Sequence, residues 1–77
     1  MPTVKRFGSV RVCVYADDHA PPHFHLIGRA SELLVRIEDM TVVQGSTRDA
    51  NMGRALAWAR EHRDALLAIW AHLNDVA

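Results

Sequence analysis

The sequence lacks a second cysteine, a long apolar run and an excess of charge of either sign. Cys13 is the only cysteine of the 77 residues, so no disulfide can form within the chain. No stretch is apolar over the about 20 residues that a membrane helix needs. The N-terminal residues also lack the charged-then-apolar pattern of a signal peptide. We therefore expect a cytoplasmic protein that does not associate with a membrane.

The charges of the chain balance, with nine Lys and Arg against nine Asp and Glu. This balance does not predict a nucleic-acid partner, although it leaves room for a local arginine patch. Hydrophobic residues make up 49% and charged residues 23%, which is typical of a globular protein. We expect residues 1–77 to form a single domain. So short a chain buries only roughly 60% of its unfolded surface, and a second copy or a bound metal would stabilise it.

Three segments alternate apolar and polar residues with the two-residue period of a β-strand. Their apolar members are Val10, Val12 and Val14 in residues 9–15, Phe24 and Leu26 in residues 23–27, and Leu33, Val35 and Ile37 in residues 32–38. Residues 41–44 are a candidate fourth strand. Residues 5–8 are a candidate extended lead-in, in which Gly8 marks a turn or a bulge.

The C-terminal part of the chain has the period of an amphipathic helix. Ser46 or Thr47 is a candidate N-cap, and residues 54–75 continue the pattern without interruption. Such a helix is longer than the strands, so it either breaks at Gly53 or carries Trp70 beyond the sheet to meet another chain. The patterns predict an α+β fold, in which an antiparallel three- or four-stranded β-meander packs on one long C-terminal helix (β-β-β-α). We also expect the protein to form a homo-oligomer.

Residues 17–25 hold three of the five histidines. His23 and His25 are two apart in a predicted strand and therefore project from one face, while His19 lies across a stiff double-proline turn. Three imidazoles with an open fourth position are typical of a catalytic zinc site. His19, His23 and His25 are thus candidate ligands for Zn²⁺ or another divalent transition metal. A metal-bound water at this position would suit a hydrolase or a nuclease.

Three more residues are candidates for supporting such a site. Asp17 and Asp18 could bind the metal, orient a histidine or act as a general base. The alternative is a structural loop, in which Asp18 accepts hydrogen bonds from loop amides and the imidazoles pair with carbonyl groups. His62 projects into the apolar stripe of the helix. We expect it either to be a buried, neutral residue or, if it reaches the end of the sheet, to join His19.

The strand face turned away from the helix is mixed in character, which is typical of a binding or oligomer surface. Its predicted members are Arg11, Cys13, Tyr15, His23, His25, Leu34 and Arg36. Arg11, Tyr15 and Arg36, together with Trp70 of the helix, are candidate contacts for a partner or ligand. A non-catalytic protein-interaction module is therefore the alternative function. The same arginines, histidines and tyrosine would also suit phosphate or RNA.

The segment Asp18-His19-Ala20-Pro21-Pro22-His23-Phe24-His25, followed by Trp58-x3-His62 and Trp70, resembles the domain of unknown function 4160 family of small, mostly bacterial proteins. The resemblance covers nearly the whole chain and is most specific in the Pro-Pro-His-x-His core. It implies a small β-β-β-α domain and a gene beside that of another small protein, as in toxin–antitoxin-like pairs. It implies no activity. The polar residues 46–53 depart from the firmer helix start expected of the family.

Overall fold

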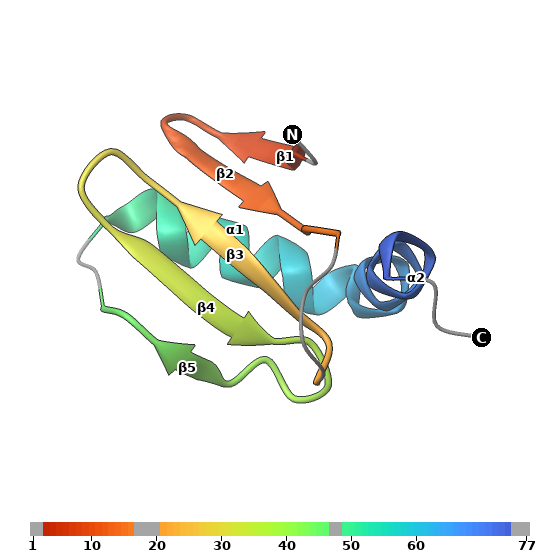
Figure 1. Cartoon of the computed structure of the whole chain (residues 1–77). Helices are drawn as coiled ribbons and strands as arrows, with labels where there is room; N and C mark the ends of the chain where they lie inside the picture. The colour runs from red at the N-terminus through yellow and green to blue at the C-terminus, as the bar shows by residue number, and fades with distance from the viewer. Residues whose placement is uncertain (1–2, 17–20, 47–48, 75–77) are drawn as a thin grey trace.

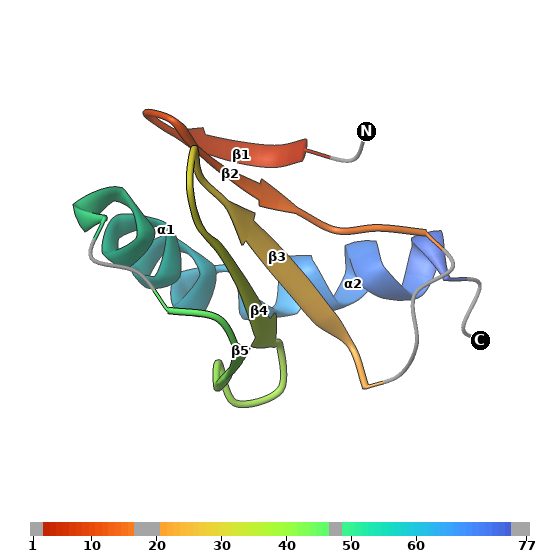
Figure 2. The ribbon, with the colours of Figure 1, turned by 60° about the vertical axis from the view of Figure 1, so that its left-hand side comes forward.

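The structure, a computed structural model, describes residues 3–16, 21–46 and 49–74. Within these ranges the elements are β1 (Thr3–Phe7), β2 (Val10–Cys13), β3 (His23–Ile27), β4 (Glu32–Arg36), β5 (Val42–Gln44), α1 (Ala50–Glu61) and α2 (Arg63–Leu73). The strands form one antiparallel sheet in sequence order, and both helices lie behind it (Figure 1 and Figure 2). The α+β class and the meander are confirmed. The expected three or four strands and one long helix are corrected to five strands and two helices.

The core lies between the sheet and the helices, because alternation turns the apolar residues of β2, β3 and β4 toward the helices. All eight apolar residues predicted for this face are buried, and the helices contribute Met52, Ala55, Ala59, Leu66 and Trp70. Burying a large apolar side chain of this kind stabilises the fold by about 1.5–3 kcal/mol. The one-sided core leaves the other face of the sheet without a covering helix.

β1 is a full strand where the sequence predicts only an extended lead-in. It pairs antiparallel with β2 and has one register irregularity between Thr3 and Lys5. The turn between the two strands contains Gly8, whose φ of 59° lies in the left-handed region. A Cβ at this position would also lie 2.8 Å from the side-chain nitrogen of Asn51 in α1. Glycine therefore serves both the turn and the close approach of the helix.

α1 starts later than the sequence predicts. Its N-cap is Asp49, whose Oδ1 accepts a hydrogen bond from the Asn51 backbone N–H at 2.9 Å. Ser46 lies before this cap and outside the helix, and Thr47 lies outside the described residues. Aspartate suits the position because its carboxylate satisfies a backbone donor at the positive end of the helix dipole.

The helical segment breaks at His62 rather than at Gly53, which lies inside α1. His62 has φ −117° and ψ 26°, outside the helical region, and ends one helix as it begins the next. Its backbone N–H is shared between the carbonyls of Trp58 and Ala59, each at 3.1 Å, as is common at a helix terminus. Neither helix, as far as the structure describes them, is long and apolar enough to cross a membrane.

Trp70 does not lie on an exposed end of the helix, as the partner-contact prediction required. Only 4% of its surface is exposed, because the break at His62 redirects α2 and lets it pack against β3. At the end of α2, Asn74 donates from its side-chain nitrogen to the Tyr15 carbonyl at 3.1 Å. The end of the helix is thus tied to the sheet, and Trp70 belongs to the core.

Candidate functional site

The face of the sheet turned away from the helices carries the side chains that could bind a metal or transfer a proton. Strand pairing places Cys13 of β2 opposite His25 of β3, and His25 opposite Leu34 of β4. His23 lies opposite Arg36 in the same pair of strands. Because residues two apart in a strand share a face, His23 and His25 project together from the side away from the core, as predicted.

Three aromatic rings meet on this face. The ring centres of His23 and His25 are 5.4 Å apart, and that of Tyr15 is 4.8 Å from His25 in an edge-to-face arrangement. We call Tyr15, His23 and His25 the ring cluster. Edge-to-face packing stabilises aromatic pairs and limits the rotation of each ring. The side chain of His25 is only 18% exposed, so its ring has a defined position.

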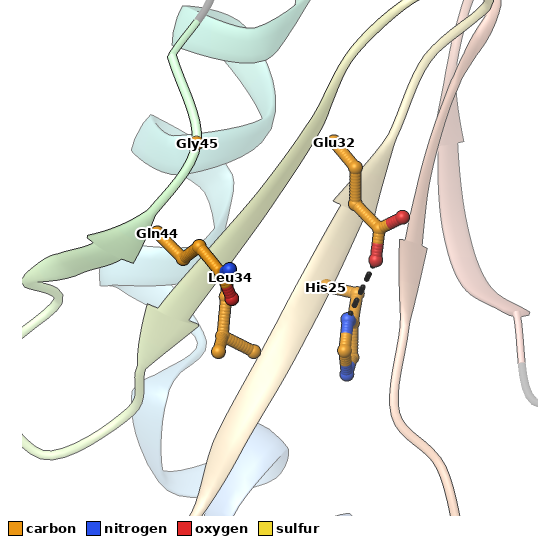
Figure 3. Close-up of a pocket in the computed structure, with 5 residues that line it drawn as sticks. All are labelled: His25, Glu32, Leu34, Gln44 and Gly45. Atoms are coloured by element: carbon orange, nitrogen blue, oxygen red, sulfur yellow. Dashed lines mark hydrogen bonds and ion pairs between the residues drawn. The ribbon is translucent and has the colours of Figure 1, made fainter.

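Each histidine of the ring cluster is oriented by an oxygen atom at Nδ1. The Nδ1 of His25 lies 3.0 Å from Oε2 of Glu32 (Figure 3). The Nδ1 of His23 lies 2.9 Å from the Pro21 carbonyl oxygen. A carbonyl oxygen and a carboxylate only accept hydrogen bonds, so both Nδ1 atoms carry the proton. In the neutral rings the lone pair then resides on Nε2, which is the arrangement of many metal-binding and proton-transferring histidines.

An open pocket of about 370 Å³ lies beside His25. Its lining residues are His25, Glu32, Leu34, Gln44 and Gly45, drawn in Figure 3. Gly45 has a φ of 94°, and a Cβ at this position would collide with the Glu32 carbonyl oxygen. Glycine therefore allows the chain after β5 to pass close to β4. The pocket wall combines the apolar Leu34 with the polar pair of His25 and Glu32.

Tyr15 is a hydrogen-bonding group rather than an anion on this face. Burial raises its pKa above the ordinary value, and the nearby Cys13 thiol and Glu32 carboxylate raise it further, while Arg11 lowers it. The phenol is therefore protonated at neutral pH. Cys13 is fully buried within the sheet, although it lies on the side away from the helices.

Arg36, a predicted contact for a partner, is bound within its own turn. Its Nε and Nη2 donate to the two carboxylate oxygens of Asp39 at 3.1 and 2.7 Å. This pairing raises the pKa of Arg36 and holds the pKa of the Asp39 carboxyl far below its usual range. Asp39 also accepts from the Thr41 backbone N–H at 3.1 Å. The charge of Arg36 therefore stabilises the turn between β4 and β5.

His62 does not join the histidines of the ring cluster. It lies between the two helices, on the other side of the sheet, where its ring stacks on Trp58 at 4.3 Å between ring centres. Its Nδ1 lies 2.7 Å from the Trp58 carbonyl oxygen, and the residue is half-buried rather than fully buried. The contacts of His62 are thus structural ones within the helical segment.

The remaining predicted residues of the metal site, Asp17, Asp18 and His19, lie outside the described residues. Among the residues that are described, no group of three or more His, Cys, Asp or Glu side chains could hold a metal ion. Two of the three predicted ligands, His23 and His25, lie side by side, with ring centres 5.4 Å apart.

A family profile described as "Domain of unknown function (DUF4160)" matches residues 10–71. The chain belongs to this family. The match runs from the start of β2 into α2, so the part of the chain shared with DUF4160 contains the whole ring cluster. No curated protein and no solved structure matches the chain. Membership of DUF4160 assigns no activity, so any function has to be argued from the site.

In this DUF4160 chain, the sequence prediction of the site missed Glu32 and Gln44. Glu32 pairs with Ile27 across the β3–β4 turn, which brings it diagonally beside His25 on the same face. A fixed register for the hairpin at residues 28–31 would have revealed this neighbour. Gln44 reaches the pocket only through the irregular pairing of β4 with β5, for which the sequence holds no comparable signal.

Proposed function

We propose that the chain binds a divalent transition metal through Nε2 of His23 and His25, on the face of the sheet away from the helices. The observation that carries the proposal is that Nδ1 of each ring donates to an oxygen, in His23 to the Pro21 carbonyl and in His25 to Glu32. Such acceptors fix the tautomer and raise the basicity of the ligating nitrogen. The ring centres are 5.4 Å apart. A Zn²⁺ ion bound to both Nε2 atoms would lie about 2.0–2.1 Å from each.

Two imidazoles alone hold a metal weakly, so the site needs further ligands. The sequence supplies His19 as the third imidazole, with Asp17 and Asp18 as further ligands or as partners that orient a histidine. Residues 17–20 connect Ala16, next to Tyr15 of the ring cluster, to Pro21, whose carbonyl orients His23. Zn²⁺ is one of the divalent transition metals that suit such an imidazole-rich site, and a water in its open position would act as the nucleophile of the alternative function, a hydrolase or nuclease.

Zinc binding by protein purified without an affinity tag tests the proposal. We expect about one equivalent of zinc and a melting temperature that rises with added zinc, since a ligand of the native state stabilises it. His23→Ala and His25→Ala should each abolish the rise, whereas His72→Ala, at an exposed position of α2, should preserve it. Glu32→Gln should weaken zinc binding about 10- to 100-fold, because it removes the carboxylate that orients His25. A melting temperature that zinc leaves unchanged would overturn the proposal.

A separate observation favours a second function, self-association through β5. This edge strand exposes Val42 and Val43, by 40% and 55%, and carries no charged residue. The opposite edge strand, β1, carries Lys5 and Arg6, and charged side chains on an edge strand oppose pairing with another strand. We propose that β5 pairs antiparallel with β5 of a second copy, which creates a two-fold symmetric dimer.

Light scattering coupled to gel filtration tests the second function. We expect a dimer for the unchanged chain and a monomer for Val43→Lys, while Ala57→Lys, on the exposed side of α1, should remain a dimer. A monomer at every concentration argues against self-association. If the chain forms a complex only with the product of a neighbouring gene, then a toxin–antitoxin-like pair, as the family resemblance implies, replaces the homodimer.

A further inference from the structure

The chain is neutral overall, but its charges are unevenly distributed along the sheet. The β1–β2 turn, the β3–β4 turn and the start of α1 lie at one end of the molecule (Figure 1 and Figure 2), which we call the hairpin end. The cations on the elements that meet there are Lys5, Arg6, Arg11, Arg29 and Arg54. The described carboxylates at this end are Glu32 and Asp49, and both are engaged, with His25 and with the backbone of α1.

The opposite end of the molecule has the reverse balance. Its described carboxylates outnumber its cations, and the members are Glu38, Asp39, Glu61 and Asp64 against Arg36, Arg60 and Arg63. Two of these cations are paired, Arg36 with Asp39 at 2.7 Å and Arg63 with Asp64 at 3.4 Å. Among the described residues, positive charge without an ion-pair partner is therefore concentrated at the hairpin end.

None of the five hairpin-end cations forms an ion pair within the described ranges. Arg6 and Arg11 lie directly opposite each other in the β1–β2 pair. Like charges in this position repel each other and destabilise a strand pair. An anion from outside the chain, bound between the two guanidinium groups, would relieve this repulsion.

Aromatic rings lie beside two of these cations, Lys5 and Arg54. Lys5 Nζ and Arg54 Cζ are each 5.9 Å from the ring centre of Phe7. The ring of Trp58 packs edge-on against Phe7 at 6.1 Å, and both rings are half-buried, so each keeps some exposed surface. Cations beside partly exposed rings are typical of single-stranded nucleic-acid sites, where the cations contact phosphates and the rings stack on bases.

We propose that the hairpin end binds single-stranded nucleic acid. Arg6 and Arg11 contact phosphates on one side of β1, and Lys5 and Arg54 contact them on the other side. His62 stacks on one face of the Trp58 ring, so a base contacts the part of Phe7 and Trp58 that stays exposed. An acidic protein segment would need the cations but not the rings, so the rings favour a nucleic acid. The proposal does not depend on bound metal, although Glu32, which orients His25 of the metal site, lies at the hairpin end.

Fluorescence anisotropy with labelled uridine-rich RNA and thymidine-rich DNA, each of roughly 12 nucleotides, tests the proposal in buffer that contains a chelator. Affinity should fall as salt rises, with a slope of about −0.7 in log–log form for each phosphate contacted. Arg6→Gln combined with Arg11→Gln should weaken binding at least tenfold at low salt and flatten the slope by about 1.4. Arg60→Gln combined with Arg63→Gln removes the same charge at the opposite end and should leave both quantities unchanged.

The outcomes separate the proposal from its alternatives. Binding of RNA or DNA, with a loss confined to the hairpin-end variant, supports it, and the ratio of the two affinities identifies the natural ligand. Equal losses of affinity in the two double variants would show an effect of net charge alone and would overturn the proposal. A chain that binds heparin but neither RNA nor DNA would also overturn it. If the hairpin-end variant melts early, Arg29→Gln, at an exposed turn residue, replaces it as the test.

Discussion

Two glycines occupy contrasting positions at the scale of the single residue. Gly45 has a φ of 94° and a path close to the Glu32 carbonyl, whereas a Cβ added at Gly53 of α1 would meet no atom within 4 Å. Gly45→Ala should destabilise the fold by about 1–3 kcal/mol through backbone strain alone. Gly53→Ala should stabilise it by about 0.4–1 kcal/mol, because alanine lowers the entropy of the unfolded chain. Urea unfolding measures both, and equal midpoints for the two variants would contradict the prediction.

The pair of Arg36 and Asp39 predicts a pH dependence. The pKa of Asp39 lies far below its ordinary value of about 3.9, so the folded state binds fewer protons than the unfolded state in acid. The contribution of this carboxylate is fully present above about pH 4 and is lost as the pH falls toward the pKa of the folded state. Asp39→Asn should therefore lose stability at pH 6 and begin to converge with the unchanged chain as the pH falls from about 4 toward about 2.

Unfolding midpoints in urea between about pH 6 and pH 2 check this convergence. Asp64→Asn is the matched control, because its contact with Arg63 at 3.4 Å is longer and its side chain is 96% exposed. A constant difference between Asp39→Asn and the unchanged chain across the range would show that the carboxylate charge of Asp39 does not cause the loss of stability.

At the scale of the elements, the junction of α1 and α2 depends on His62. Its ring stacks on Trp58, and its Nδ1 hydrogen-bonds to the Trp58 carbonyl. Since an aromatic pair and a hydrogen bond each contribute about 0.5–1.5 kcal/mol, His62→Ala should lower the free energy of unfolding by about 1–2 kcal/mol. His62→Phe keeps a ring for stacking and should recover part of the loss. Unchanged unfolding in His62→Ala would mean that flanking packing alone fixes the junction.

The strands that face the core could be predicted from the sequence, and β1 could not. In β2, β3 and β4 one face is buried and the other is not, so a period of two is present in the residues themselves. β1 lies at an edge, carries Lys5 and Arg6, and shifts register after Thr3, so no alternation marks it. Its position depends on pairing with β2, which is a tertiary property.

The helix break and half of the candidate site escaped prediction for the same reason. The helical period continues on both sides of His62, and neither glycine nor proline stands there, so only the contacts with Trp58 reveal the break. His23 and His25 were found because their shared face follows from spacing within one strand. Glu32 comes beside His25 only through the register of a hairpin, which spacing within one strand does not specify.

At the scale of the whole molecule, the two faces of the sheet have different roles, one in the core and the other in the candidate site. The helices cover one face and form the core, and the other face carries the ring cluster beside an open pocket. β3 takes part in both, since Phe24 is fully buried between His23 and His25, which project from the opposite face. Residues adjacent in the sequence therefore have different roles, and substitutions at neighbouring positions can test each role on its own.

Phe24→Ala should destabilise the fold by about 3–5 kcal/mol, the usual cost of removing a buried phenyl ring. A domain of this length has a total stability of about 4–12 kcal/mol, so the variant should unfold at much lower urea and melt more than about 12 °C earlier. His23→Ala combined with His25→Ala removes two ring contacts and two hydrogen bonds and should cost about 1–3 kcal/mol, less than Phe24→Ala. Urea unfolding followed by circular dichroism measures both. If the double histidine variant loses as much stability as Phe24→Ala, then the ring cluster is a structural part of the fold, and loss of zinc binding in that variant would no longer identify metal ligands.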